Sequence, residues 1–210
     1  MNNKKFNEFF ESIKDKLGIR KTSFTKIFQY LDNIKGPINI VETGCLRIKD
    51  NFKGDGQSTL LFDKYTQFRG EKSKVYTVDI NPRATEVCRS VVSDNVEIHT
   101  GDSVKYLIEL LPKLKKAEQK ISLFYLDSFD VDWQSSDRSA AHHLKEITAI
   151  INYISKETLI VVDDAPILAP MKIENEKMSF ITEHPAPKPF IGGKGYLVNE
   201  FAFANNATLY

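Results

Sequence analysis

Carboxylate side chains follow two of the predicted strands, and their position makes them the first candidates for chemistry. Asp127 ends an apolar run at residues 121–127, and Asp163 and Asp164 directly follow the run at 158–162. Because the carboxyl ends of parallel strands border one crevice, we expect these three carboxylates to lie close together. They repel one another unless a cation neutralises them, and a hard divalent ion prefers such oxygen ligands. The sequence therefore predicts a metal site here; the alternative is that these acids cap a loop and a helix.

A glycine turn after the first buried strand is the second candidate site. The run at 38–41 is rich in β-branched residues, which suits a strand covered on both faces, and it leads into Glu42, Thr43 and Gly44. Gly44 permits close approach of the backbone to a ligand. A helix is expected to begin at about Ser58. A strand, a glycine turn and a helix N-terminus together form the crevice in which nucleotide-like cofactors bind.

Two further acids follow predicted strands at places that suit a nucleoside. Asp79 lies at the end of the strand at 75–80, where a carboxylate can accept hydrogen bonds from both ribose hydroxyls. That geometry serves NAD and S-adenosylmethionine (SAM) alike. Asp102 follows the strand at 96–99 and is also an excellent helix N-cap. The alternative for Asp79 is likewise a capping role at a strand-to-helix turn.

The glycine turn resembles motif I of the class I SAM-dependent methyltransferases. Glu42-x-Gly44 followed by a delayed Gly56-x-Ser58 carries this resemblance, and the G-x-G-x-x-G of dinucleotide sites is absent. The residues at 48–55 separate the two glycine positions, and we expect them to form an enlarged loop at the mouth of the site. The resemblance implies that eight residues bind SAM: Glu42, Thr43, Gly44, Ser58, Asp79, Ile80, Asp102 and Ser103.

The acids after the fourth and fifth strands resemble those of metal-dependent O-methyltransferases of the catechol and macrocin types. Carried over by position, Asp127, Asp163 and Asp164 would be the ligands of a divalent cation, expected to be Mg²⁺. Such an ion would lower the pKa of a substrate hydroxyl and align its oxygen with the methyl group. The catechol type has a lysine as base three residues after its strand-four acid, whereas this chain has Asp130 there. The base must therefore differ.

Three residues are candidates for that base. His142 and His143 stand near the start of the helix after the fourth strand, and Glu146 lies one turn beyond His142. Asp130 is the competing base, or a further acid beside the metal. We therefore name His143, His142 and Asp130 as catalytic candidates; the alternative is that the histidines are packing or surface residues.

The order of elements predicts a scaffold that brings these residues together. Strand and helix alternate from 38 to 164, which is typical of a doubly wound, Rossmann-like α/β sheet, here of the class I methyltransferase type. We expect a single domain over 1–210, built from a helical N-terminal cap (1–36), the SAM-binding core (38–164) and a last segment (165–210). That segment should hold a lid loop at 182–195 and late antiparallel strands at 196–198 and 207–210.

Composition excludes some classes of partner. The 210 residues carry 29 Lys and Arg against 28 Asp and Glu, so that a net charge of +1 provides no general attraction to nucleic acid or to acidic membranes. Cys45 and Cys88 are far apart in the sequence, which indicates reduced thiols and a cytoplasmic protein. No signal peptide and no apolar run of membrane-spanning length is visible.

These observations predict a SAM-dependent, Mg²⁺-assisted O-methyltransferase that acts on a hydroxyl of a small molecule, such as a sugar or a glycan precursor. The first rival is an NAD-dependent oxidoreductase, which the missing G-x-G-x-x-G disfavours. The second rival is a SAM-binding interaction protein without catalytic activity. A homo-oligomer is compatible with the sequence, which does not decide the oligomeric state.

Overall fold

Two compact units make up the chain in the computed structural model. The structure describes residues 4–70, 72–132, 135–168, 171–174, 177–180 and 190–208. The first unit comprises Met1–Ser128 and Thr148–Val161, and the second comprises Phe129–Ile147 and Val162–Tyr210. The prediction of a single domain over the whole chain stays a prediction.

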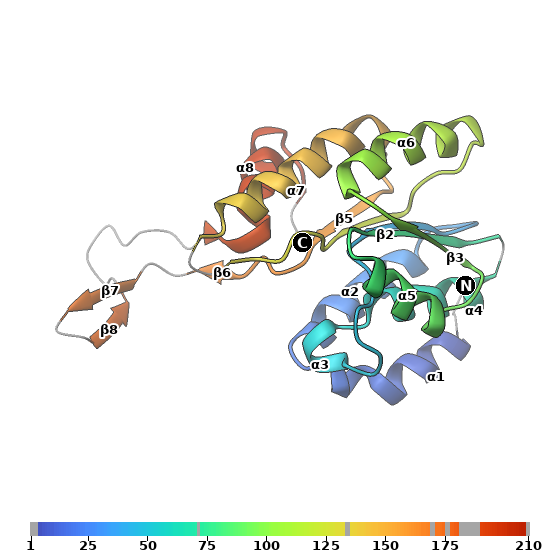
Figure 1. Cartoon of the computed structure of the whole chain (residues 1–210), viewed down its shortest axis with the longest axis horizontal. Helices are drawn as coiled ribbons and strands as arrows, with labels where there is room; N and C mark the ends of the chain where they lie inside the picture. The colour runs from blue at the N-terminus through green and yellow to red at the C-terminus, as the bar shows by residue number, and fades with distance from the viewer. Residues whose placement is uncertain are drawn as a thin grey trace. The chain divides into compact units, whose positions relative to one another are not determined.

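A five-stranded parallel sheet in the order β3-β2-β1-β4-β5 confirms the predicted Rossmann-like α/β fold (Figure 1). Ile40 in β1 pairs with Val75 in β2 on one side and with Leu123 in β4 on the other. The strand order therefore reverses between β1 and β4, and ligands of open α/β sheets bind at such a switch point. The strands are β1 (Asn39–Thr43), β2 (Lys74–Asp79), β3 (Val96–Thr100), β4 (Leu123–Leu126) and β5 (Leu159–Val162).

Helices cover both faces of this sheet, with α1, α2, α4 and α5 on one side and α6 on the other (Figure 1). Local sequence fixes where two of them begin. The Asn81 side chain accepts a hydrogen bond from Arg83 N with Pro82 in the first turn of α5, and Asp102 accepts from Lys105 N at the start of α6. The helices of this part are α1 (Lys4–Ile13), α2 (Arg20–Asp32), α3 (Phe52–Asp55), α4 (Ser58–Arg69), α5 (Pro82–Val91) and α6 (Ser103–Lys116), with a 3₁₀ turn η1 (Lys14–Leu17).

Aromatic side chains attach the N-terminal helices to the core. The ring of Phe6 in α1 lies 4.5 Å from that of Phe28 in α2 and 4.9 Å from that of Tyr65 in α4, and all three are buried. Edge-to-face contacts at these separations stabilise the packing beyond the area that they bury. The predicted N-terminal helical segment is thus confirmed, and its role as a cap over a substrate stays a prediction.

The second unit contains most of α7 and the chain after β5. Two antiparallel pairs occur there, β6 with β9 and β7 with β8, each forming a separate two-stranded sheet. Its elements are α7 (Asp137–Ile150, whose last turn belongs to the first unit), β6 (Ile167–Leu168), β7 (Met171–Glu174), β8 (Lys177–Phe180), β9 (Phe190–Ile191), the 3₁₀ turn η3 (Gly193–Gly195) and α8 (Tyr196–Ala204); a further 3₁₀ turn, η2 (Ile151–Tyr153), follows α7 in the first unit.

The predicted late strand at 196–198 is wrong, because these residues begin helix α8. Short apolar runs fit a strand or a helix equally well, and here Phe201 continues the apolar spacing of Leu197 into the next turn. Among the described residues, no antiparallel strand joins the five-stranded sheet. Residues 207 and 208 form no strand, and 209 and 210 lie outside the described residues, as does most of the predicted lid loop.

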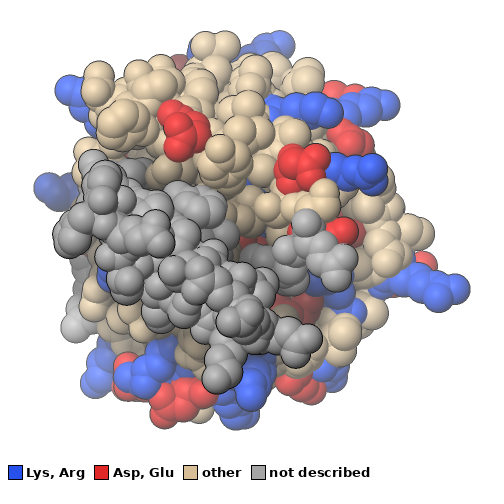
Figure 2. Space-filling model, turned by 90° about the vertical axis from the view of Figure 1, so that its left-hand side faces the viewer, with Lys and Arg blue, Asp and Glu red and all other residues tan. Residues whose placement is uncertain are grey.

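Charged side chains of both signs are interspersed over the described part of the face shown in Figure 2. This agrees with the nearly balanced composition. Within the described ranges, no helix is both long and apolar enough to cross a membrane. The predictions about nucleic acid, membranes, oligomers and a cytoplasmic location otherwise stay predictions.

Candidate functional site

The turn after β1 packs directly against the end of β4. Gly44 has φ +81°, and its N–H donates to Val78 O at 2.8 Å. Asp127 N donates to Thr43 O at 2.8 Å, and a Cβ placed on Gly44 would lie 2.5 Å from Asp127 O. Only glycine meets both conditions, a left-handed backbone and a contact too close for a side chain. The switch point of the sheet is thus built around Gly44.

Glu42, the carboxylate just before this turn, is completely buried. Its Oε2 accepts hydrogen bonds of 2.7 Å from the hydroxyls of Thr59 and Thr77, whereas its Oε1 has no hydrogen-bond partner among the described residues. Burial raises the pKa of Glu42 to about 7, although the hydroxyls of Ser58, Thr59 and Thr77 oppose that rise; the charge of Asp127 adds to it. Buried polar atoms are nearly always paired, so Oε1 is an acceptor in need of a donor.

Asp79 connects the end of β2 to the same turn. Its Oδ2 accepts from Cys45 N at 3.2 Å, and its Oδ1 accepts from Asn81 N at 2.8 Å. Asp79 therefore stabilises the strand-to-helix turn, whereas the N-cap of α5 is Asn81. Each carboxylate oxygen can accept a second hydrogen bond, and Asp79 is only half-buried, so a ribose role is compatible with it. The neighbouring Ile80 is 73% exposed.

The remaining residues assigned to the cofactor lie at the ends of elements. Thr43 is the buried last residue of β1, and Ser58 is buried at the start of α4. Asp102 is exposed and caps α6, and the buried Ser103 donates to the Ser128 hydroxyl at 3.5 Å. The structure thus assigns Asp102 its capping role, and its predicted part in SAM binding stays a prediction.

The residues between the two glycine positions fold back on themselves. The carboxylate of Asp55 accepts from Arg47 N at 3.0 Å and from Ile48 N at 3.3 Å, and Gln57 Nε2 donates to Ile48 O at 2.7 Å. The short helix α3 lies inside this segment. The segment predicted as an enlarged loop at 48–55 is therefore held by its own hydrogen bonds and contains helix α3.

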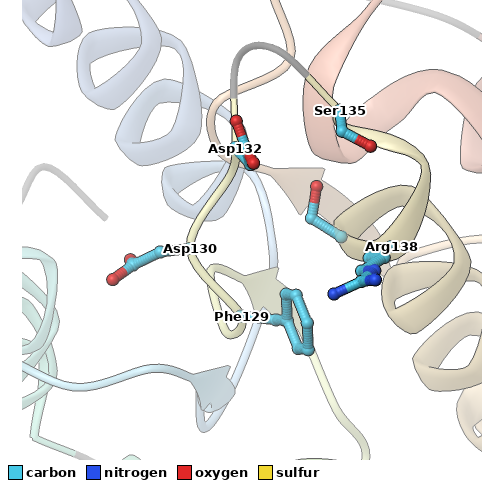
Figure 3. A pocket seen from close by; sticks show the side chains of 6 residues that line it. Phe129, Asp130, Asp132, Ser135 and Arg138 are labelled. Carbon is cyan, nitrogen blue, oxygen red and sulfur yellow. The ribbon is translucent and has the colours of Figure 1, made fainter.

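A pocket in the second unit contains one of the catalytic candidates, Asp130 (Figure 3). Phe129 is 51% exposed and has φ +49°, which is rare for a bulky residue and occurs mostly where a site holds the backbone in place. Its ring stacks on His142 with centroids 5.2 Å apart. Figure 3 shows Arg138 directed toward Phe129 and the Asp130 carboxylate pointing away from both. The pocket is lined by Phe129, Asp130, Asp132, Ser135, Arg138 and Ser139.

The two histidines differ in their surroundings. His143 is fully buried, and its Nδ1 lies 2.7 Å from Ser139 O, so Nδ1 carries the proton and Nε2 does not. Nε2 has no hydrogen-bond partner in the described part of the chain. Burial lowers the pKa of His143, which Lys194 and His142 also lower and Glu146 opposes. His143 is therefore a neutral imidazole at neutral pH.

His142 is the histidine in contact with the pocket, through its stacking on Phe129. Its Nε2 lies 3.6 Å from Oε1 of Glu146, which is fully buried. A carboxylate beside an imidazole can orient the ring for proton transfer. Of the two histidines, His142 has the surroundings that suit a base. The catalytic assignments themselves stay predictions.

The acids predicted to bind a metal are divided between the two units. Asp127 belongs to the first unit, and Asp163 and Asp164 belong to the second. Asp163 Oδ1 accepts from Asp164 N at 2.9 Å, and Asp164 Oδ2 lies 3.2 Å from Lys194 Nζ. Over the described ranges, no group of three or more His, Cys, Asp or Glu side chains is arranged to hold a metal ion. That the three acids share one ion stays a prediction.

Lys194 is the residue that sequence reasoning missed. It stands in Gly192-Gly193-Lys194-Gly195, a composition that indicates a loop, yet its side chain is 1% exposed. A charged residue surrounded by glycines is ordinary on a surface. The only signal in the sequence was the glycines themselves, which allow the backbone to pack closely.

Comparison with known proteins adds no family to this geometry. Neither a scan against protein-family models nor a search of curated proteins found a match to this chain. The class that can be stated is therefore the fold class, a Rossmann-like α/β protein with a parallel sheet in the order 3-2-1-4-5.

Proposed function

We propose that the protein is a SAM-dependent methyltransferase that acts on a hydroxyl group of a small molecule. One observation carries the proposal: Glu42 is buried at the switch point with Oε1 unpartnered among the described residues, immediately before the Gly44 turn. A buried carboxylate with an unpartnered oxygen suits an ammonium group, and the methionine end of SAM carries one.

The surrounding residues fit the other parts of the same molecule. Asp79 is bonded to the turn through Cys45 N and stands at the strand end where a ribose is expected. Gly44 lets the turn pack against the backbone of Asp127, which holds the ends of β1 and β4 together beside Glu42. When bound, SAM would supply an electrophilic methyl group. The protein would contribute orientation and control of charge.

The pocket of the second unit is the proposed acceptor site. It combines an exposed aromatic ring, two carboxylates, a guanidinium and serine hydroxyls. Such a lining offers acceptors and donors around one apolar face, which suits a small hydroxylated molecule. His142, which stacks on Phe129 of this pocket and is paired with Glu146, is the proposed acceptor of the hydroxyl proton.

The predicted Mg²⁺ fits only part of this site. Asp127 and Asp163 are half-buried acids at strand ends and suit a hard cation. Asp164 is already paired with the ammonium of Lys194, so an ion at Asp164 would have to displace or share that charge. Methyl transfer is therefore proposed without a step that depends on the metal.

Thermal unfolding distinguishes the proposed cofactor from its rival. S-adenosylhomocysteine at about 100 times its Kd should stabilise the protein by about 2.7 kcal/mol, because it binds only the folded state. For a chain of this length, that free energy corresponds to a rise in Tm of about 5–10 °C. NAD at the same concentration should leave Tm unchanged. A shift with NAD and none with S-adenosylhomocysteine would return the site to an oxidoreductase.

Substitution of Asp79 tests the ribose assignment. Asp79→Ala removes a charged acceptor, which is worth about 1.5–3 kcal/mol. The affinity for S-adenosylhomocysteine, measured by titration calorimetry, should therefore fall about 10- to 150-fold. Glu86→Ala, which removes an exposed carboxylate on α5 outside the proposed site, is the matched control and should leave the affinity unchanged. If wild type and Asp79→Ala bind S-adenosylhomocysteine equally well, Asp79 only stabilises the turns that it is bonded to.

A methyltransferase is distinguished from a binding protein by turnover. Incubation with SAM and a panel of hydroxylated acceptors should yield S-adenosylhomocysteine and a methylated product, both detected by mass spectrometry. Tight cofactor binding without product from any acceptor would favour the non-catalytic alternative.

A further inference from the structure

We propose that Lys194 is the built-in counter-ion of Asp164, and that this ammonium stands in place of the divalent cation that the sequence predicts at Asp164. The inference concerns only the second unit, which contains both residues. It does not depend on the cofactor. It assigns a role to a lysine that the proposed reaction does not use.

Lys194 is attached to Asp164 through both its backbone and its side chain. Lys194 N donates to Asp164 O at 3.2 Å, and Lys194 Nζ lies 3.2 Å from Asp164 Oδ2. The backbone bond places Lys194 beside Asp164, and the side chain then brings its ammonium to the carboxylate of the same residue.

The glycines beside Lys194 make this attachment feasible. Gly193 has φ +58°, and a Cβ on it would lie 2.2 Å from Asp164 O. A Cβ on Gly195 would lie 2.6 Å from Cβ of Ala165. Gly192 N also donates to Pro166 O at 2.9 Å. The segment 192–195 thus lies directly on the chain that leaves β5, and neither Gly193 nor Gly195 leaves room for a side chain.

Burial explains why the pair must persist. The Lys194 side chain is 1% exposed and that of Asp164 is 28% exposed. A buried ammonium without a partner is far more costly than a paired one, so removal of either partner leaves an uncompensated charge. The buried Glu146 and His143 belong to the same surroundings, since the charges of both Lys194 and Glu146 act on His143.

A divalent cation at Asp164 would meet this ammonium at close range. With Nζ 3.2 Å from Oδ2, an ion bound to the same carboxylate would lie within a few ångströms of a positive charge. The hydrogen bond from Lys194 N to Asp164 O keeps the residue beside Asp164, and burial of the side chain leaves the ammonium little access to water. Asp164 also has φ +45°, so its own backbone is held in an uncommon conformation by the same contacts.

Titration with Mn²⁺, followed by electron paramagnetic resonance, tests the proposal on the full chain. Asp164 should contribute nothing to Mn²⁺ binding in wild type, so wild type and Asp164→Asn should give the same titration. Lys194→Met, which keeps the length and removes the charge, should bind Mn²⁺ at least tenfold more tightly than wild type. The double variant Lys194→Met/Asp164→Asn should lose that gain. Lys194→Arg is the matched control, because it keeps the charge and should behave as wild type does.

Two results would overturn the proposal. The first is Mn²⁺ binding by wild type that Asp164→Asn abolishes, since Asp164 would then be a metal ligand beside Lys194. The second is a Lys194→Met variant that folds and titrates as wild type does. The titration is independent of cofactor binding, so a protein that fails to bind S-adenosylhomocysteine would refute the proposed function and leave this result unaffected.

A measurement on the wild-type protein covers the case in which Lys194→Met does not fold. In ¹⁵N-labelled protein at pH 7, the ammonium protons of Lys194 should exchange with water slowly enough to give an NMR signal, because the group is buried and paired. Lys145, exposed on α7, is the reference for rapid exchange. Equally rapid exchange at both lysines would contradict the ion pair.

Discussion

Replacement of Glu42 by glutamine is expected to abolish tight S-adenosylhomocysteine binding and, at the same time, to stabilise the ligand-free protein at pH 8. The first effect follows from the unpartnered Oε1, which in the proposed complex accepts from the ammonium of the ligand. Removal of one partner of a buried ion pair costs about 3–5 kcal/mol. The expected loss of affinity is therefore roughly 150- to 4,000-fold.

The stabilisation follows from the pKa of Glu42. Burial raises it from an ordinary value of 4.5 to about 7. Between these values the folded protein binds more protons than the unfolded chain, so the free energy of unfolding falls as the pH rises through this window. At about 1.4 kcal/mol per pH unit, ionised Glu42 costs the folded state roughly 3 kcal/mol above pH 7. Glutamine has no charge to bury, so the difference between variant and wild type should appear at pH 8 and vanish at pH 4.5.

Urea unfolding at a series of pH values measures this difference. Glu97→Gln is the control, because Glu97 lies on β3, which β2 separates from β1, and is exposed. It should change neither the affinity nor the pH dependence. A Glu42→Gln variant that binds S-adenosylhomocysteine as tightly as wild type would show that Glu42 is a structural residue and would remove the observation on which the proposed function depends.

Binding should also change the protonation of Glu42. An ammonium beside Oε1 favours the ionised carboxylate, so binding at pH 6 should release a proton. Calorimetry in two buffers of different ionisation enthalpy detects this release. In Glu42→Gln, any residual binding should show no such dependence on the buffer.

Strand ends were the part of the site that the sequence could predict. Each acid at 79, 127 and 163 follows an apolar run, and parallel strands of four to six residues leave little choice about where such a run ends. Local chemistry also identified Asp102, because an N-cap depends only on the residues next to it. These predictions rest on interactions within a few residues of the chain.

The burial of individual side chains could not be predicted from the sequence. His142 and His143 are adjacent, yet one contacts an exposed ring and the other is sealed in the interior. The phase of a helix against its neighbours decides this difference, and the adjacent Ala140 and Ala141 are too small to show from the sequence which face is buried. Lys194 is similar, because its partner Asp164 lies thirty positions earlier in the chain. Such pairs form through tertiary contacts alone.

Of the glycine-to-alanine substitutions in the first unit, Gly44→Ala is expected to lower the free energy of unfolding most. Its Cβ would lie 2.5 Å from Asp127 O and 2.8 Å from Asp127 C, which are backbone atoms of β4's end and cannot turn aside. The positive φ adds roughly 1–2 kcal/mol for any residue with a side chain. The clash would also push the ends of β1 and β4 apart. We therefore expect the free energy of unfolding to fall by more than about 4 kcal/mol, the range of severe core substitutions.

Gly36→Ala isolates the backbone part of this effect. Gly36 has φ +83°, almost the same as +81° at Gly44, and a Cβ there would meet nothing within 4 Å. The free energy of unfolding of Gly36→Ala should therefore fall only by the roughly 1–2 kcal/mol that a side chain costs in the left-handed conformation. Urea unfolding of both variants gives the difference, which is the cost of the contact with Asp127.

Because the Gly44 turn also positions Glu42 and Cys45 N, S-adenosylhomocysteine binding should fail in Gly44→Ala and persist in Gly36→Ala. Equal stability of the two variants would mean that the β1 turn does not pack on β4, and the cofactor crevice proposed between them would have to be abandoned.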